Sequence, residues 1–183
     1  MKKKILLVFI MTFLLACNFL FPQTPRATPE PAVARSTEPE SEPGDTPDAT
    51  SLGMEIVRLH PEDGDIQTLL AQEAQKAVEL GLMPVVEFDA TWCPPCQAID
   101  AGLHSNNELL LDAYAGTYII KLDVDEWGWG DSRLHDFDFA GIPVYFKLDE
   151  NGQPTGETID GNAWGENIPE NIAPPMDEFF HGE

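Results

Sequence analysis

Cysteine is scarce in this chain of 183 residues, which contains only three. Cys93 and Cys96 are separated by two prolines, whereas Cys17 lies alone in an apolar N-terminal segment. A framework of several structural disulfides is therefore excluded, and the folded part must be held together by its hydrophobic core. The redox chemistry that cysteine can supply is concentrated at one pair, which is close enough in the chain to form a reversible disulfide.

Basic residues are also few, because ten Lys and Arg stand against 32 Asp and Glu, and the formal net charge is −22 at pH 7. Such an acidic chain is unsuited to binding nucleic acid or an anionic lipid surface. The four histidines are scattered without metal-ligand spacing, and a single Cys-x-x-Cys supplies only half of a zinc site. We therefore expect no metal site and no cofactor.

The first residues are expected to be a targeting segment and no part of the fold. Lysines at positions 2–4 precede an apolar run over residues 5–15, as in the signal of an exported protein. The run ends in Leu-Leu-Ala-Cys17, which resembles the lipobox of bacterial lipoproteins. The resemblance implies that residues 1–17 carry a cleavable signal peptide and that the sulfur of Cys17 receives a diacylglyceryl group. An uncleaved signal anchor is the alternative, and both place the remaining chain outside the cytoplasmic membrane.

Residues 18–52 are rich in proline, interleaved with Thr, Ser, Ala, Glu and Asp. This composition offers no apolar periodicity to bury, and it predicts an extended, disordered, acidic linker. We interpret the segment as a tether that holds the following domain away from the membrane. Residues 53–183 are long enough for one domain with a hydrophobic core and too short for two.

Helical and strand patterns alternate along residues 53–183. A helix is expected over residues 66–80, where apolar residues fall close to one face and Gly81 follows. Another helix is expected after the capping-box pattern of residues 105–108. Strands are expected over residues 117–124, 144–148 and 155–159, and a short helix over residues 132–140. This order predicts an α/β domain with a mixed β-sheet that ends in a hairpin.

The cysteine pair stands between a predicted strand and a predicted helix. Residues 85–91 form a short, apolar, β-branched run that is typical of a buried strand, and residues 97–101 contain good helix formers. Cys93 is thereby placed at a helix N-terminus, where free N–H groups and the helix dipole stabilise a thiolate. This arrangement predicts a thiol–disulfide oxidoreductase, with a permanent structural disulfide as the alternative.

Four segments together resemble the thioredoxin family. Glu87–Cys96 resembles its active-site segment, Lys121–Asp125 its third strand, Gly141–Val144 its cis-proline loop and Phe146–Gly152 its closing hairpin. The resemblance implies that residues 53–183 adopt the thioredoxin fold, a central mixed β-sheet flanked by helices. The Cys-Pro-Pro-Cys sequence is similar to that of membrane-tethered thioredoxin-like proteins that serve cytochrome c maturation.

The chain departs from the family pattern at two places. Val144 follows the proline of the cis-proline loop, where threonine is common. Pro169, Pro174 and Pro175 lie in the C-terminal region, and they predict that the usual last helix is shortened or displaced.

The resemblance implies catalytic roles for four residues. Cys93, predicted to be the more exposed and more acidic cysteine, is the nucleophile, and Cys96 resolves the mixed disulfide. Glu87 occupies the position of a buried acid beneath the resolving cysteine, where desolvation would raise its pKa and let it accept the Cys96 proton. Lys121 occupies the position of that acid's charge partner. For Glu87 and Lys121, a solvated surface charge is the alternative.

Substrate contacts are predicted around the pair. Trp92 is expected to shield the disulfide from one side, with a role in core packing as the alternative. Pro94 and Pro95 stiffen the loop and remove two N–H groups that could stabilise the thiolate, which should make the pair more reducing. The resemblance to the cis-proline loop implies that Pro143 follows a cis peptide bond, which would leave the backbone of Ile142 free to pair with an extended substrate segment.

Together these observations predict a membrane-anchored, extracytoplasmic disulfide reductase of the bacterial cell envelope. Its expected partners are protein thiol/disulfide substrates, a membrane electron donor and the lipid anchor on Cys17, with no nucleic acid. Three alternatives remain: a disulfide oxidase or isomerase, a copper-binding lipoprotein that uses the two cysteines and one histidine, and a non-catalytic partner-binding lipoprotein with a structural disulfide.

Overall fold

The computed structural model describes residues 53–182, and the predicted signal peptide, lipidated Cys17 and linker lie outside the described residues. The strands are β1 (Glu55–Arg58), β2 (Met83–Asp89), β3 (Thr117–Asp123), β4 (Val144–Leu148) and β5 (Pro154–Asp160). The α-helices are α1 (Ile66–Glu79), α2 (Pro94–His104), α3 (Glu108–Ala113), α4 (Val124–Trp127) and α5 (Pro169–His181). Short 3-10 turns occupy Pro61–Asp63 and Ser132–Leu134. Within residues 53–182, none of the helices has the length and apolar character needed to span a membrane.

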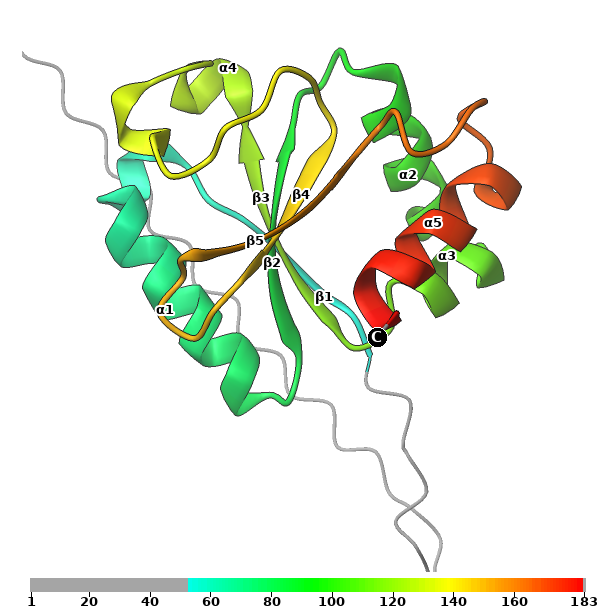
Figure 1. The fold of residues 1–183 in the computed structure, drawn as a ribbon, viewed down its shortest axis with the longest axis horizontal. Coiled ribbons are helices and arrows are strands. Elements are labelled where there is room, and N and C mark those ends of the chain that lie inside the picture. Colours follow the sequence, from blue (N-terminus) through cyan, green and yellow to red (C-terminus); the bar gives the residue numbers. More distant parts are fainter. Residues whose placement is uncertain (1–52, 183) are drawn as a thin grey trace, which may run out of the picture. The chain divides into compact units, whose positions relative to one another are not determined.

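The strands form one five-stranded sheet in the order β1-β3-β2-β4-β5. β1, β3 and β2 run parallel, whereas β4 runs antiparallel to β2 and β5 antiparallel to β4. Figure 1 shows α1 and α4 on one side of the sheet and α2, α3 and α5 on the other. The predicted α/β class, with a mixed sheet flanked by helices, is confirmed.

The central strands direct alternate side chains to two separate cores. On β2, Val86 and Phe88 belong to the core on the side of α1, and Val85 belongs to the core that includes Ile172 of α5. Because successive side chains of a strand point to opposite faces, Glu87 is on the same face as Val85. The two-residue period of β2 therefore places an acidic side chain under α2, inside the domain.

The edge strand β1 is absent from the prediction. Its residues are mostly exposed, and it is only four residues long, so it carries neither strict alternation nor a buried run. It exists because Ile56 and Val57 pair in parallel with Ile119 and Ile120 of β3. This pairing brings Arg58 beside Lys121.

The beginning of α3 differs from the predicted capping box. Ser105 instead ends α2, and its hydroxyl donates to the carbonyl of Gly102 at 3.0 Å. Asn106, at φ 56°, then turns the chain, and the side chain of Asn107 caps α3 by accepting the N–H of Leu110 at 3.3 Å. The helix itself forms where it was expected, because asparagine is a strong N-cap residue.

The short helix predicted over residues 132–140 is wrong. Only the 3-10 turn Ser132–Leu134 forms there, while an unpredicted helical turn, α4, follows β3 directly. Asp123 starts α4 by accepting the N–H of Asp125 at 2.8 Å. The rings of Phe137 and Phe139 both pack against Phe88, so the segment is held by tertiary contacts of single aromatic side chains.

The expected shortening or displacement of the last helix is also wrong. α5 spans 13 residues, with Pro169 in its first turn and Pro174 and Pro175 inside it. A first-turn proline is harmless, whereas an interior proline removes a helical hydrogen bond and costs about 3 kcal/mol. Burial of Ile172, Ala173, Met176 and Phe180 on one face offsets that cost.

Candidate functional site

The two cysteines close a disulfide at the start of α2. Cys93 is the N-cap residue, and Pro94 and Pro95 are the first two helical residues. Since proline has no N–H, the first free donor of the helix is the backbone N–H of Cys96, which points to Cys93 Sγ at 3.3 Å. The predicted disulfide pairing and the predicted position of Cys93 at the helix N-terminus are both present.

Cys93 and Cys96 are equally buried in this oxidised form, each with 1% of its surface exposed. The expectation that Cys93 is the more exposed cysteine is therefore wrong for the disulfide state. Both residues belong to the core cluster that includes Ala90 and Val124, and partly buried Ile142 packs against that cluster. Attack on the disulfide thus requires the reagent to reach sulfur atoms that lie beneath the surface.

Trp92 is the exposed neighbour of the disulfide, with 56% of its surface accessible. Its indole Nε1–H donates to the carboxylate of Asp125 on α4 at 2.7 Å. Packing of Trp92 in the core is excluded by this exposure, and its shielding of the disulfide stays a prediction. Trp127 and Trp164 are instead the buried tryptophans, and the Nε1–H of Trp127 donates to the carbonyl of Leu59 at 3.0 Å.

The cis-proline loop lies beside the start of α2. The peptide bond between Ile142 and Pro143 is cis, and the carbonyl of Pro143 accepts the N–H of Gly161 at 3.0 Å. A cleft of about 310 Å³ runs along this loop. Its lining residues are Pro95, Gly141, Ile142, Asp160, Gly161, Asn162 and Asn167. The structure thus brings together Pro95 and Ile142, two residues that were predicted to contact substrate.

Glu87 and Lys121 lie opposite each other on β2 and β3. Only 2% of Glu87 and 4% of Lys121 is exposed, so neither is a solvated surface charge. Lys121 Nζ lies 3.4 Å from Glu87 Oε1. That oxygen is buried and has no hydrogen-bond partner.

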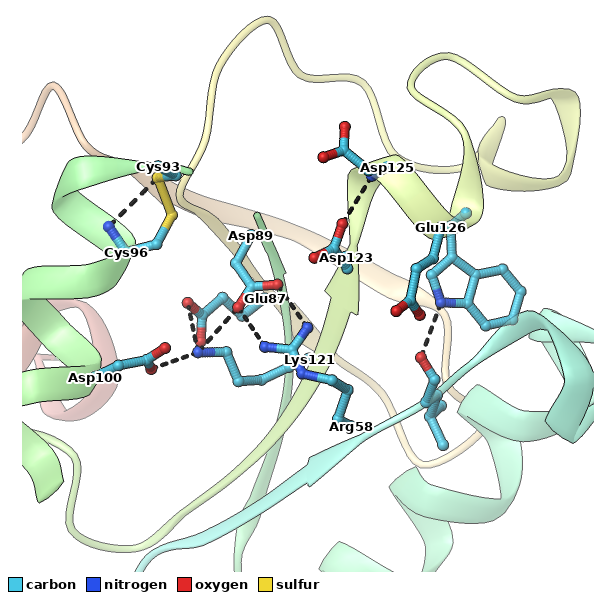
Figure 2. A network of polar contacts seen from close by, with 12 residues as sticks. Arg58, Glu87, Asp89, Cys93, Cys96, Asp100, Lys121, Asp123, Asp125 and Glu126 are labelled. Carbon is cyan, nitrogen blue, oxygen red and sulfur yellow. Dashed lines mark hydrogen bonds and ion pairs between the residues drawn. A yellow bond between two sulfur atoms is a disulfide. The ribbon is translucent and has the colours of Figure 1, made fainter. Parts of the chain in front are cut away.

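The surrounding charges form a network that the sequence analysis missed (Figure 2). Lys121 Nζ lies 2.6 Å from Asp100 Oδ1 on α2 and 3.0 Å from Asp89 Oδ2 on β2. The carboxylate of Asp89 also accepts hydrogen bonds from both terminal nitrogens of Arg58 on β1, at 2.9 and 2.6 Å. Strand periodicity could have identified Asp89, which is two residues from Glu87 on the same face. Arg58 could not be found, since β1 itself was missed.

Burial raises the pKa of Glu87 to about 7. The ammonium of Lys121 opposes this shift, Asp89 and Asp100 reinforce it, and a hydrogen bond from Tyr145 opposes it. Burial lowers the pKa of Lys121, but the carboxylates of Glu87, Asp89 and Asp100 together raise it above its ordinary value. The site therefore holds a permanently charged lysine beside a carboxyl group that titrates near neutral pH.

Two buried tyrosines complete the surroundings of Glu87. Tyr145 lies directly opposite Glu87 in the antiparallel β2–β4 pair, and the hydroxyl of Tyr114 donates to the hydroxyl of Tyr145 at 3.1 Å. Because Tyr114 supplies that hydrogen, the hydroxyl hydrogen of Tyr145 is free to point at Glu87. Phe180 of α5 packs edge-on against both rings.

A reversible dithiol at a helix start, a buried acid and a cis-proline loop on one mixed sheet define a dithiol–disulfide redox protein. The Thioredoxin family model matches residues 66–173, more than half of the chain. The chain therefore belongs to the thioredoxin family, and it is a thiol–disulfide oxidoreductase.

The chain is also similar to individual thioredoxins. The chain is 31% identical to mouse thioredoxin over 107 residues, which cover 58% of this chain and 89% of the mouse protein. It is 35% identical to Staphylococcus aureus thioredoxin over 103 residues, covering 56% of this chain and 86% of that protein. Among solved structures, Trichomonas vaginalis thioredoxin aligns with a TM-score of 0.39 and 26% identity, covering 57% of this chain and 84% of that one.

Proposed function

We propose that this protein is a membrane-tethered reductase of disulfides in proteins outside the cytoplasmic membrane. We infer the direction of electron flow from the start of α2, where Pro94 and Pro95 occupy the first two helical positions. One backbone N–H, that of Cys96, then faces Cys93 Sγ. A reduced pair whose thiolate has few donors is less stabilised, and a less stabilised dithiol is a stronger reductant.

The residues support a two-step exchange. The thiolate of Cys93 attacks a substrate disulfide, forms a mixed disulfide and releases one substrate thiolate. Cys96 then attacks the sulfur of Cys93 and releases the second substrate thiolate, while its own proton passes to Glu87. An extended substrate segment along the backbone of Ile142 would present its disulfide beside Pro95, at the cleft described above.

The membrane tether is proposed from the sequence alone. The lipobox-like segment ending at Cys17 and the proline-rich residues 18–52 support an anchored domain that is exported and recharged by a membrane electron donor. Partition of the expressed protein into the detergent phase, with incorporation of labelled fatty acid, tests this proposal. Cys17→Ser should abolish the label. Membrane retention of an unlabelled, uncleaved wild-type chain would instead establish a signal anchor.

The direction of electron flow is tested by titrating the full-length protein against a dithiol redox buffer and trapping free thiols. We expect a midpoint near that of thioredoxin, about −270 mV. A midpoint near −120 mV would make the protein an oxidant of exported proteins and overturn the proposal. Cys93→Ala should abolish disulfide exchange, whereas full activity of that variant would exclude Cys93 as the nucleophile.

A further inference from the structure

Three acidic side chains compete for one buried lysine. Lys121 Nζ lies 2.6 Å from Asp100, 3.0 Å from Asp89 and 3.4 Å from Glu87. The longest of these contacts leaves Glu87 Oε1 without a hydrogen bond, although the oxygen is buried. Lys121 therefore interacts more closely with the two aspartates than with Glu87.

A negative charge is also better stabilised on Asp89 and on Asp100 than it would be on Glu87. Asp89 is held by both arms of the Arg58 guanidinium, a geometry that selects a carboxylate. The side chain of Asp100 remains 40% exposed, so water helps to stabilise its charge. The two cations are then matched by two aspartates, and a negative charge on Glu87 would have no cation of its own. A buried carboxyl group in that position is most stable with its proton bound.

We propose that Asp89, together with Asp100, is a positioning residue that withholds Lys121 from Glu87. Glu87 thereby keeps its proton in the oxidised protein and gives it to the sulfur of Cys96 when the disulfide opens. This inference rests on the proposed disulfide chemistry, and it concerns the half of the cycle in which the protein is reduced again.

The step balances with a donor dithiol as the reductant. The donor's thiolate attacks the sulfur of Cys93, the disulfide breaks, and its electron pair leaves on the sulfur of Cys96, which takes the Glu87 proton. The second thiol of the donor loses its proton to solvent and attacks the donor sulfur of the mixed disulfide. Cys93 leaves as a thiolate, the donor is oxidised to a disulfide, and Glu87 is left ionised. It can then accept the proton of Cys96 in the next substrate reduction.

Groups on each neighbouring element contribute to the charge state of Glu87. Lys121 on β3 favours ionisation, and Tyr145 on β4 favours it through its hydrogen bond, while Asp89 on β2 and Asp100 on α2 oppose it. Tyr114, at the end of α3, acts through Tyr145. Arg58 on β1 is bound to Asp89, and Phe180 on α5 brings no charge. Removing either aspartate should lower the pKa of Glu87, because the change deletes a repelling charge and also releases Lys121 toward Glu87.

Carbon-13 NMR of the Glu87 carboxyl group in the oxidised full-length protein tests the proposal, with Glu87→Gln assigning the signal. Asp89→Asn and Asp100→Asn should each lower the titration midpoint of Glu87 by about one pH unit or more. Glu157→Gln is the matched control, since it removes an exposed acid that pairs with Lys147, and it should leave the midpoint unchanged. Asp100→Asn keeps the test available if Asp89→Asn fails to fold, because Asp100 is only half-buried.

A second measurement links the titration to the chemistry. The rate of disulfide reduction by dithiothreitol should be several-fold lower in Asp89→Asn than in wild type at neutral pH. The ratio of the two rates should return toward one as the pH is lowered, because Glu87 is then protonated in both proteins. An unchanged or raised Glu87 midpoint in both variants would overturn the proposal, as would an unchanged pH profile of reduction. A redox midpoint of about −120 mV would refute the proposed reductase direction without altering these results, so the two failures are distinguishable.

Discussion

Trp92 and Asp125 are joined by a hydrogen bond of 2.7 Å from the indole nitrogen to the carboxylate. Trp92 directly precedes Cys93, and Asp125 lies on α4, which directly follows β3. The contact fixes the orientation of an exposed aromatic ring beside the disulfide. Helix α4, which has no predicted counterpart in the sequence, thus reaches the redox site.

Releasing this ring should impair substrate binding more than folding. We expect Asp125→Ala to raise KM for a disulfide-containing protein several-fold, because the freed indole samples other rotamers. The free energy of unfolding should change by less than about 1 kcal/mol, since the contact is exposed. Glu126→Ala is the control, because this neighbouring acid contacts His60. Equal KM values for Asp125→Ala and wild type would show that the orientation of Trp92 does not matter.

The raised pKa of Glu87 predicts a pH-dependent stability. Between the ordinary value of 4.5 and about 7, the folded state binds more protons at this site than the unfolded state. The contribution of Glu87 is therefore fully present below pH 4.5 and is lost as the pH rises through 7, amounting to on the order of 3 kcal/mol. Urea unfolding of wild type and Glu87→Gln at several pH values measures it. The variant should gain stability relative to wild type as pH rises, and a constant difference would contradict the prediction.

The buried tyrosine pair should show energetic coupling. Tyr145→Phe leaves the hydroxyl of Tyr114 without its acceptor and should destabilise the fold by about 1–3 kcal/mol. Tyr114→Phe removes only a donor to Tyr145 and should cost about 1 kcal/mol. The double variant should be less destabilised than the sum of the two, as urea unfolding would measure. Tyr118→Phe, whose hydroxyl binds Glu73, should be additive with either change. Additivity between Tyr114 and Tyr145 would refute the coupling.

Gly152 in the β4–β5 turn is predicted to be irreplaceable. Its φ of +76° disfavours any side chain, and an added Cβ would lie 2.5 Å from the backbone carbon of Leu70 in α1. Gly156 also has a positive φ, +95°, but an added Cβ there would meet no atom within 4 Å. Gly156→Ala should cost about 1–2 kcal/mol from backbone strain alone. Thermal unfolding should show a larger loss for Gly152→Ala, and equal losses would mean that α1 can move aside.

Elements with strong local signals were predictable. Helix α1 begins and ends within one residue of the expected range. Asp65 caps its start, and its apolar residues recur with the period of a helix, so that they fall on one face. The hairpin of β4 and β5 follows from the turn at Asn151-Gly152. The last helix was misjudged because proline was weighed by its local cost, whereas the packing of Phe180 and its neighbours outweighs it.

The sequence by itself determined the redox motif of this protein. A buried strand, a turn, Cys93 as N-cap, two prolines and Cys96 lie within residues 83–96, so their geometry follows from local backbone preferences. The equal burial of the two cysteines and the competition for Lys121 were decided only by tertiary structure. Arg58 and Asp89 are 31 residues apart, and Asp100 and Lys121 are 21 apart. Such ion pairs depend on which strands lie side by side, and that order is set by packing of the whole sheet against its helices.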